Sequence, residues 1–190
     1  MIARLFVAEV RKLNGSLAML LAVVAPAMVG LLCFLGAFAG DRAPHWGEIM
    51  GAMTVQVWAF FLLPMTLAAL TALVGQIEYR TKAWDHLLAL PIPRWAVYLT
   101  KAATVLGVVA VMTALVFVFA WLGSVAGGAV TGRMPSGELP WDRIARAGAF
   151  IVVAGALMVV LQLWVALRFA NFVVPLAFGI GGAWCRSPSW

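Results

Sequence analysis

Charged residues are scarce in this sequence, and acidic residues are scarcer than basic ones. Only 11% of the 190 residues are charged, with 7 Asp and Glu against 13 Lys and Arg, whereas soluble domains carry about 25%. Hydrophobic residues make up 65% of the chain, and the mean hydropathy is +1.03. This composition excludes a soluble globular domain, a disordered chain and a nucleic-acid-binding module, and it indicates an integral membrane protein.

Residues that build catalytic and metal sites are also few. The topology predicted below places the two histidines, His45 and His86, on opposite sides of the membrane, and Cys33 and Cys185 have no metal-ligand spacing. The sequence has no phosphate-binding GxxxxGK[ST] loop. The predicted spans contain no Asp, Glu or His, which disfavours an intramembrane protease or a proton-coupled transporter. We therefore predict that the chain is not an enzyme and binds no cofactor or metal, so any ATP hydrolysis occurs in a separate subunit.

Long apolar runs supply the fold prediction. A bilayer core about 30 Å thick is crossed by about 20 residues of helix. The apolar runs are 17–39, 49–74, 102–126, 147–167 and a shorter one at 169–184. Their continuous rather than alternating hydrophobicity excludes a transmembrane β-barrel. The predicted fold class is therefore an all-α polytopic membrane helix bundle, one transmembrane domain over residues 1–190 with five visible spans.

The first apolar run, 17–39, also resembles a secretory signal peptide, because Ala37-Phe38-Ala39 is similar to a cleavage site. Its 23 residues exceed the usual apolar region of about 7–15 residues in such signals. We therefore interpret this run as a transmembrane span that is not cleaved from the protein.

Basic residues set the predicted orientation. A cytosolic N-terminus puts eight of them inside: Arg4, Arg11, Lys12, Arg80, Lys82, Arg94, Lys101 and Arg168. It puts five outside: Arg42, Arg133, Arg143, Arg146 and Arg186. Because basic residues favour the cytosolic side and the first helix usually dominates, we predict that the N-terminus is cytosolic.

The residues before the first span predict an amphipathic helix over 2–14 that lies in the membrane interface. Glu9 falls near the middle of its apolar face, where an unpaired carboxylate is costly. Lys12 is a local partner, and Arg80, Lys82 and Lys101 of the next cytosolic segment are the alternatives. A generic membrane anchor is the competing interpretation of this helix.

The cytosolic loop 76–101 is the most informative stretch. It predicts a short helix that ends before Pro91, because the residue preceding a proline avoids the α region. Its apolar face carries Trp84, Leu87 and Leu88, and its polar face carries Lys82, Asp85 and His86. Such a helix can dock on a cytosolic partner, or it can lie on lipid as a simple re-entry loop. Adjacent helical residues point in different directions, so Asp85 and His86 do not form a catalytic pair.

Two segments carry a resemblance to a known family. The loop pattern Glu78…Thr81…Leu87-Leu88-Ala89-Leu90-Pro91-Ile92-Pro93-Arg94…Lys101 and the opening Ala8-Glu9-Val10-Arg11-Lys12-Leu13 resemble the ABC-2 type permeases. The resemblance is greatest to the branch with lantibiotic immunity and multidrug-efflux permeases. It implies six helices, an interfacial elbow helix at 2–14 and a coupling helix that contacts an ATPase subunit. The implied ATPase contacts are Thr81, Lys82, Trp84, Asp85, His86 and Leu88, and the implied elbow-helix charge contact joins Glu9 and Arg80.

The resemblance implies a permease subunit of an ATP-driven ABC exporter in the bacterial cytoplasmic (inner) membrane. Its partners would be an ABC ATPase, a second permease copy or a paralogous permease, and membrane lipid, but no nucleic acid. Peptide antibiotics or hydrophobic drugs would be the substrates. Only five spans are visible, and residues 184–190 contain none of the Gly, Ala and Val residues that are frequent in the segment before them. The alternative is therefore an inactive, C-terminally truncated permease or a non-transporting membrane scaffold. An intramembrane enzyme is a third.

The orientation can be tested by labelling single cysteines in intact cells with a membrane-impermeant reagent. We expect labelling of His45→Cys and protection of Lys82→Cys. The reverse pattern would contradict the orientation.

Overall fold

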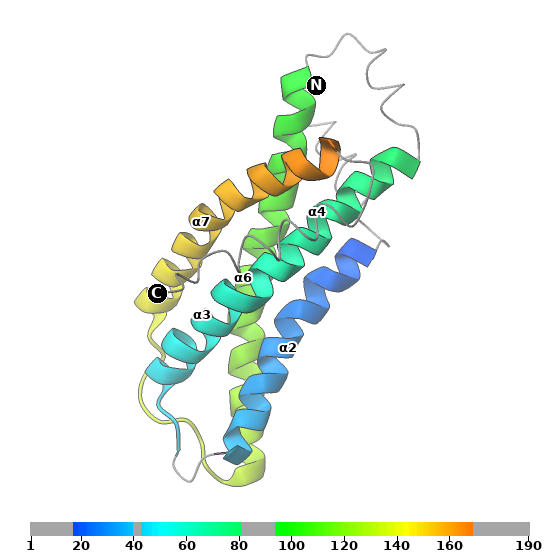
Figure 1. Cartoon of the computed structure of the whole chain (residues 1–190). Coiled ribbons are helices and arrows are strands. Elements are labelled where there is room, and N and C mark those ends of the chain that lie inside the picture. Colours follow the sequence, from blue (N-terminus) through cyan, green and yellow to red (C-terminus); the bar gives the residue numbers. More distant parts are fainter. Residues whose placement is uncertain (1–16, 40–42, 81–93, 169–190) are drawn as a thin grey trace, which may run out of the picture. The chain divides into compact units, whose positions relative to one another are not determined.

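The computed structural model describes residues 17–39, 43–80 and 94–168. Their elements are α2 (Leu17–Ala39), η1 (Glu48–Met53), α3 (Thr54–Gln56), η2 (Val57–Leu62), α4 (Leu63–Arg80), α6 (Arg94–Thr131) and α7 (Trp141–Arg168) (Figure 1). Four helical stretches among these residues are long and apolar enough to cross a membrane: Leu17–Ala39, Glu48–Val74, Tyr98–Thr131 and Trp141–Ala166. The predicted all-α membrane bundle is thus confirmed, while the predicted helix at 2–14 and span at 169–184 lie outside the described residues.

The helices are longer than the apolar runs that predicted them. The third predicted span, 102–126, lies inside α6, which has 38 residues. At about 1.5 Å per residue α6 is roughly 57 Å long, well beyond the hydrocarbon thickness of about 30 Å. Residues 127–131 and 141–146, which lie between the predicted spans 102–126 and 147–167, are also helical. The difference arises because hydropathy marks only the part of a helix that suits hydrocarbon, and a helix can continue into the interface.

The chain divides into two compact units, which the helices share. Unit 1 comprises Met1–Leu21, Pro64–Val109 and Gly155–Trp190, and unit 2 comprises Ala22–Leu63 and Ala110–Ala154. The described part of unit 1 therefore consists chiefly of α4, the first part of α6 and the last part of α7. Unit 2 holds most of α2, the segment from η1 to η2, the last part of α6 and the first part of α7.

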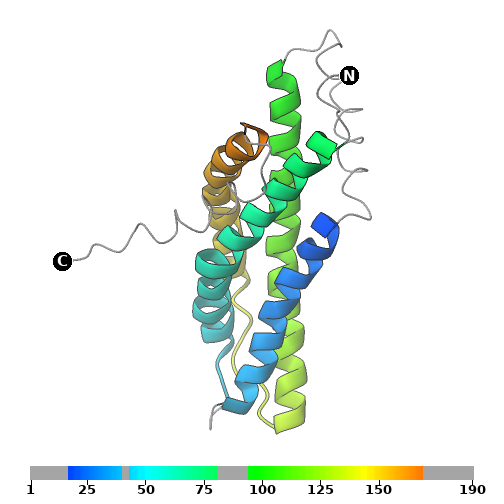
Figure 2. The ribbon, with the colours of Figure 1, turned by 45° about the vertical axis from the view of Figure 1, so that its right-hand side comes forward.

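Backbone-to-backbone packing of α2 against α6 is the tightest contact of unit 2, and both views place these segments side by side (Figures 1 and 2). A Cβ added at Gly30 would lie 2.7 Å from the Phe119 carbonyl oxygen, and one at Gly123 would overlap the Gly30 carbonyl oxygen. One turn on, a Cβ at Gly127 would lie 2.7 Å from the Ala37 Cβ. Glycines four residues apart let membrane helices approach closely, so Gly123 and Gly127 set the distance between α2 and α6.

The second span is unusual because two π-helical stretches, η1 and η2, flank the single α-helical turn of α3. A π-helix has more residues per turn than an α-helix. Together the π-helical and α-helical stretches give close to four residues per turn. Met50, Thr54 and Trp58, which are four residues apart, are all buried. The widened helix therefore keeps one straight buried stripe, which a regular α-helix would turn away from its neighbours.

The two connections of unit 2 pair with each other. The Trp46 amide donates to the Ser136 carbonyl at 3.1 Å, and the Ser136 amide donates to the Pro44 carbonyl at 3.0 Å. Before this point α6 ends at Thr131, and Gly132 follows with a φ of 70°. The Arg133 amide donates to the Gly128 carbonyl at 3.0 Å. That bond and the positive φ are those of a Schellman helix end, which turns the chain toward residues 44–46.

The packing of Gly123 generates a stability prediction. Gly123→Ala should lower the free energy of unfolding in detergent by about 1–3 kcal/mol, because the added methyl group overpacks the contact with Gly30. Gly107→Ala on the same helix is the matched control, since a Cβ there meets nothing within 4 Å. Equal stability of the two variants in a denaturation series would contradict the close crossing.

Candidate functional site

The residues predicted to contact an ATPase are outside the described structure. Thr81, Lys82, Trp84, Asp85, His86 and Leu88 fall within 81–93, and Glu9 falls within 1–16. Arg80 ends α4, but the placement of its side chain is not described. The structure therefore brings none of these side chains together, and their roles stay predictions. It does describe the two helices that lead into and out of residues 81–93, which are α4 and α6.

The part of unit 1 that these helices form has a polar core. Six polar or charged residues are buried there: Thr66, Thr71, Thr100, Lys101, Thr104 and Gln162. They come from α4, α6 and α7, so the described portions of all three helices of unit 1 contribute. Unit 2, by comparison, buries only Thr54, Thr113 and Ser124 in its described part. The polar core therefore belongs to the unit from which residues 81–93 extend.

Lys101 is the charged member of this core. Its side chain is 1% exposed and makes a polar interaction within the structure. A buried cation needs a counter-charge or several acceptors, because the cost of its desolvation is otherwise uncompensated. Glu9 and Asp85 lie outside the described residues, and the side-chain placement of Glu78 is not described. The predicted contact of Glu9 with Lys101 therefore stays untested.

The burial of Lys101 is a feature that the sequence prediction missed. The sequence places Lys101 at the end of a cytosolic loop, as a basic residue and a possible partner of Glu9, and predicts no burial for it. In the structure it lies on the same stripe of α6 as Val105 and Val109, which are 1% exposed. The spacing of four residues along α6 signals this position, because residues four apart share one helix face.

A hydrogen bond in this core joins α4 to α7. Thr71 Oγ1 lies 3.3 Å from Gln162 Oε1, and both side chains are buried. The same hydroxyl is also 2.9 Å from the Leu67 carbonyl oxygen and 3.1 Å from that of Ala68, while Gln162 Nε2 has no partner among the described residues. A half turn of the amide would let Nε2 donate to Thr71 Oγ1 and leave the hydroxyl proton for the Leu67 carbonyl, and Oε1 would then take the position without a partner among the described residues.

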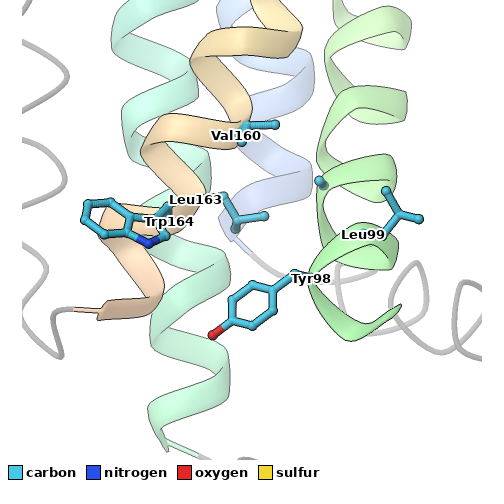
Figure 3. A pocket seen from close by; sticks show the side chains of 6 residues that line it. Tyr98, Leu99, Val160, Leu163 and Trp164 are labelled. Atoms are coloured by element: carbon cyan, nitrogen blue, oxygen red, sulfur yellow. The ribbon is translucent and has the colours of Figure 1, made fainter. Parts of the chain in front are cut away.

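Unit 1 also has an open groove between α6 and α7. It has a volume of about 470 Å³ and is lined by Tyr98, Leu99, Ala102, Val160, Leu163 and Trp164. Figure 3 shows the Tyr98 ring extending from α6 toward α7. The walls are almost wholly apolar, so the groove suits apolar groups rather than a polar ligand.

In unit 2 the buried polar groups pair across helices. Trp58 Nε1 donates to Thr113 Oγ1 at 3.3 Å, and Cys33 Sγ lies 4.0 Å from Thr54 Oγ1. Among the residues that the structure describes, no group of His, Cys, Asp or Glu could hold a metal ion. The contacts of Trp58 with Thr113 and of Cys33 with Thr54 thus join neighbouring helices of this unit.

Comparison with known proteins identifies the chain. The model of the "ABC-2 family transporter protein" family matches residues 5–184, nearly the whole sequence. The chain belongs to the ABC-2 transporter family. No curated protein and no solved structure matches it.

Membership of the ABC-2 family makes this chain a membrane-spanning transporter subunit. The four helices of membrane-crossing length are in keeping with a multi-pass membrane protein. Members of this family are the transmembrane component of a transporter and not its catalytic component.

The Thr71–Gln162 contact can be measured in a double-mutant cycle of unfolding free energies. Thr71→Val and Gln162→Leu should show a coupling of about 0.6–2 kcal/mol, the range for interhelical hydrogen bonds in membranes. Thr104→Val is the matched control, because Thr104 Oγ1 donates to the Thr100 carbonyl of its own helix. A cycle with no coupling at Thr71, or with equal coupling at Thr104, would contradict the bond between α4 and α7.

Proposed function

We propose that this chain is the permease subunit of an ATP-driven exporter, and that residues 81–90 form the coupling helix on which an ABC ATPase docks. The observation that carries the proposal is the family match, which includes this segment. The subunit would have its N-terminus in the cytosol and lie in a bacterial cytoplasmic membrane, as the basic residues and the resemblance indicate. Peptide antibiotics or hydrophobic drugs are the substrate classes that the resemblance favours.

The described helices support this role for residues 81–90. The segment connects α4 to α6, so it lies between two long helices that both enter unit 1. A force applied to the segment by an ATPase would therefore act on two helices at once. The threonines, Lys101 and Gln162 of the polar core lie on these helices and on α7, and their interactions would be rearranged together with the helices.

The chemistry of the segment suits a docking surface. Trp84, backed by Leu87 and Leu88, is the kind of large residue that carries binding energy at interfaces. Asp85 and His86 lie on the opposite face of the predicted helix and would meet the partner through hydrogen bonds and charge. We therefore expect Asp85 and His86 to be exposed when the chain is alone, and Leu88 to be buried against the ends of the spans.

Co-purification of the chain with its ATPase tests this assignment. Trp84→Ala and Asp85→Lys should lower the amount of captured ATPase and uncouple ATP hydrolysis from export, with wild-type levels of folded permease. Loss of an interface anchor of this type costs more than about 1 kcal/mol, or roughly fivefold in affinity.

Leu88→Asp is the contrasting variant, since it should reduce the amount of folded protein rather than the affinity. If both docking variants retain the ATPase at wild-type levels and export is unchanged, the coupling-helix assignment is wrong, and a membrane scaffold becomes the better interpretation.

A further inference from the structure

A histidine stands at the start of the second membrane-length helix. The helical backbone begins at Trp46, directly after His45, and continues into η1. The His45 carbonyl accepts the Glu48 amide at 2.9 Å and the Ile49 amide at 3.2 Å. A residue that precedes a helix and accepts its first hydrogen bonds with its own carbonyl is the N-cap of that helix. His45 is therefore the N-cap of this helix.

The side chain of His45 completes the cap. Its Nδ1 atom accepts the Gly47 amide at 3.2 Å. The first four amides of a helix have no carbonyl of the same helix to bond, and Gly47 is the second helical residue. An N-cap side chain commonly accepts such an amide through an oxygen of Ser, Thr, Asp or Asn, and here an imidazole nitrogen takes that place. A nitrogen that accepts this bond carries no proton, so the cap requires the neutral ring with its proton on Nε2.

The same ring is held against the connection between α6 and α7. His45 forms a β-bridge with Ser136, and a Cβ added at Gly137 would overlap the His45 ring. Gly137 also has a φ of 84°, so glycine suits this position for two reasons. All of these residues belong to unit 2. The ring therefore lies between the Gly47 amide and Gly137, and a change in its position would affect both connections.

Protonation of the ring would remove the side-chain cap. Histidine is the side-chain type that normally changes charge between about pH 5 and 8. Both nitrogens of an imidazolium are donors, so a protonated Nδ1 would face the Gly47 amide and the hydrogen bond would be lost. A positive charge at the N-terminus of a helix is also unfavourable in the field of the helix dipole. Because His45 is exposed, protons reach it directly from the solvent.

The charged groups around the cap act in both directions. A Cβ added at Gly47 would lie 3.5 Å from His45 Nδ1 and 3.8 Å from Arg143 Nη1, so a guanidinium lies on the far side of Gly47 and would repel an imidazolium. The other charged residues of the described segments that meet here are Glu48, Arg133, Glu138 and Asp142. Their carboxylates would attract an imidazolium, and Asp41 and Arg42 lie outside the described residues. The hydrogen-bonding capacity of Nδ1 is thus the property that a test must isolate.

We propose that His45 is a pH-sensitive N-cap. In its neutral form it holds the first turn of the second membrane-length helix and the pairing of that turn with the connection at 133–137, and its protonation releases both. The inference goes beyond the proposed function, because it needs neither an ATPase nor a transported substrate. In the predicted orientation, the cap would respond to the pH outside the cytosol.

His45→Asn and His45→Ala separate loss of the cap from other effects of pH. An asparagine side chain accepts the amide two residues further on, as in an Asx turn, and does not titrate. Hydrogen exchange of the full-length chain in detergent is measured at about pH 8 and about pH 5.5, on either side of the usual histidine range, and corrected for the pH dependence of the chemical exchange rate. Residues 46–49 and 133–137 are the reporters, and α2 is the reference.

We expect the wild-type chain to lose about three- to tenfold in protection at the lower pH, the size of a lost N-cap. His45→Asn should keep its protection at both pH values, and His45→Ala should have low protection at both. Equal protection of the wild-type chain at the two pH values, or an equal loss in His45→Asn, would overturn the proposal.

The protonation state of the ring can be observed separately. The chain has two histidines, so in a chain labelled with ¹⁵N-histidine the signals of His45 are those missing from His45→Asn. At about pH 8, above the usual histidine range, Nδ1 should have the chemical shift of an unprotonated nitrogen and Nε2 that of an N–H group. A proton on Nδ1 at this pH would contradict the cap, because that nitrogen could not accept the Gly47 amide.

Discussion

The absence of hydrogen-bond partners in hydrocarbon is the constraint on which the rest of this structure depends. It forces the backbone of each span into helices, which satisfy their own amides and carbonyls. It also acts on side chains, because buried polar groups pair across helices: Trp58 Nε1 donates to Thr113 Oγ1, and Thr71 Oγ1 lies 3.3 Å from Gln162 Oε1. Since hydrophobic burial does not drive helices together in lipid, these pairs and the close glycine contact specify which helices meet.

Hydropathy was sufficient to predict that four stretches of the described residues are helices of membrane-crossing length. The first predicted span, 17–39, is helical throughout, as α2. The third did not coincide with α6, since a helix that leaves the hydrocarbon is no longer marked by apolar residues. The short helix with Trp84, Leu87 and Leu88 on one face was predicted from the residue pattern, and the ATPase contacts from a resemblance. Both lie in residues 81–93, outside the described structure.

Two features of the interior could be found only with the structure. The sequence does not predict the π-helical stretches, because Glu48–Leu62 contains no proline and has the pattern of an ordinary apolar helix. Their effect is to keep Met50, Thr54 and Trp58 in one buried line. The glycine contact is different, because Gly123-x-x-x-Gly127 is visible in the sequence, but its partner Gly30 is not. Local sequence patterns indicate which face of a helix can pack closely against another helix. The identity of that other helix depends on tertiary packing.

The position of Gly123 within α6 has a mechanical consequence. Within unit 2 the contact with Gly30 lies 8 residues before Thr131, where α6 ends, roughly 12 Å at the α-helical rise. A tilt of this part of α6 about the contact would therefore move Thr131 by only about 0.2 Å per degree, at that rise. A pivot so close to the helix end leaves the paired connections at Trp46 and Ser136 almost still while the helix tilts.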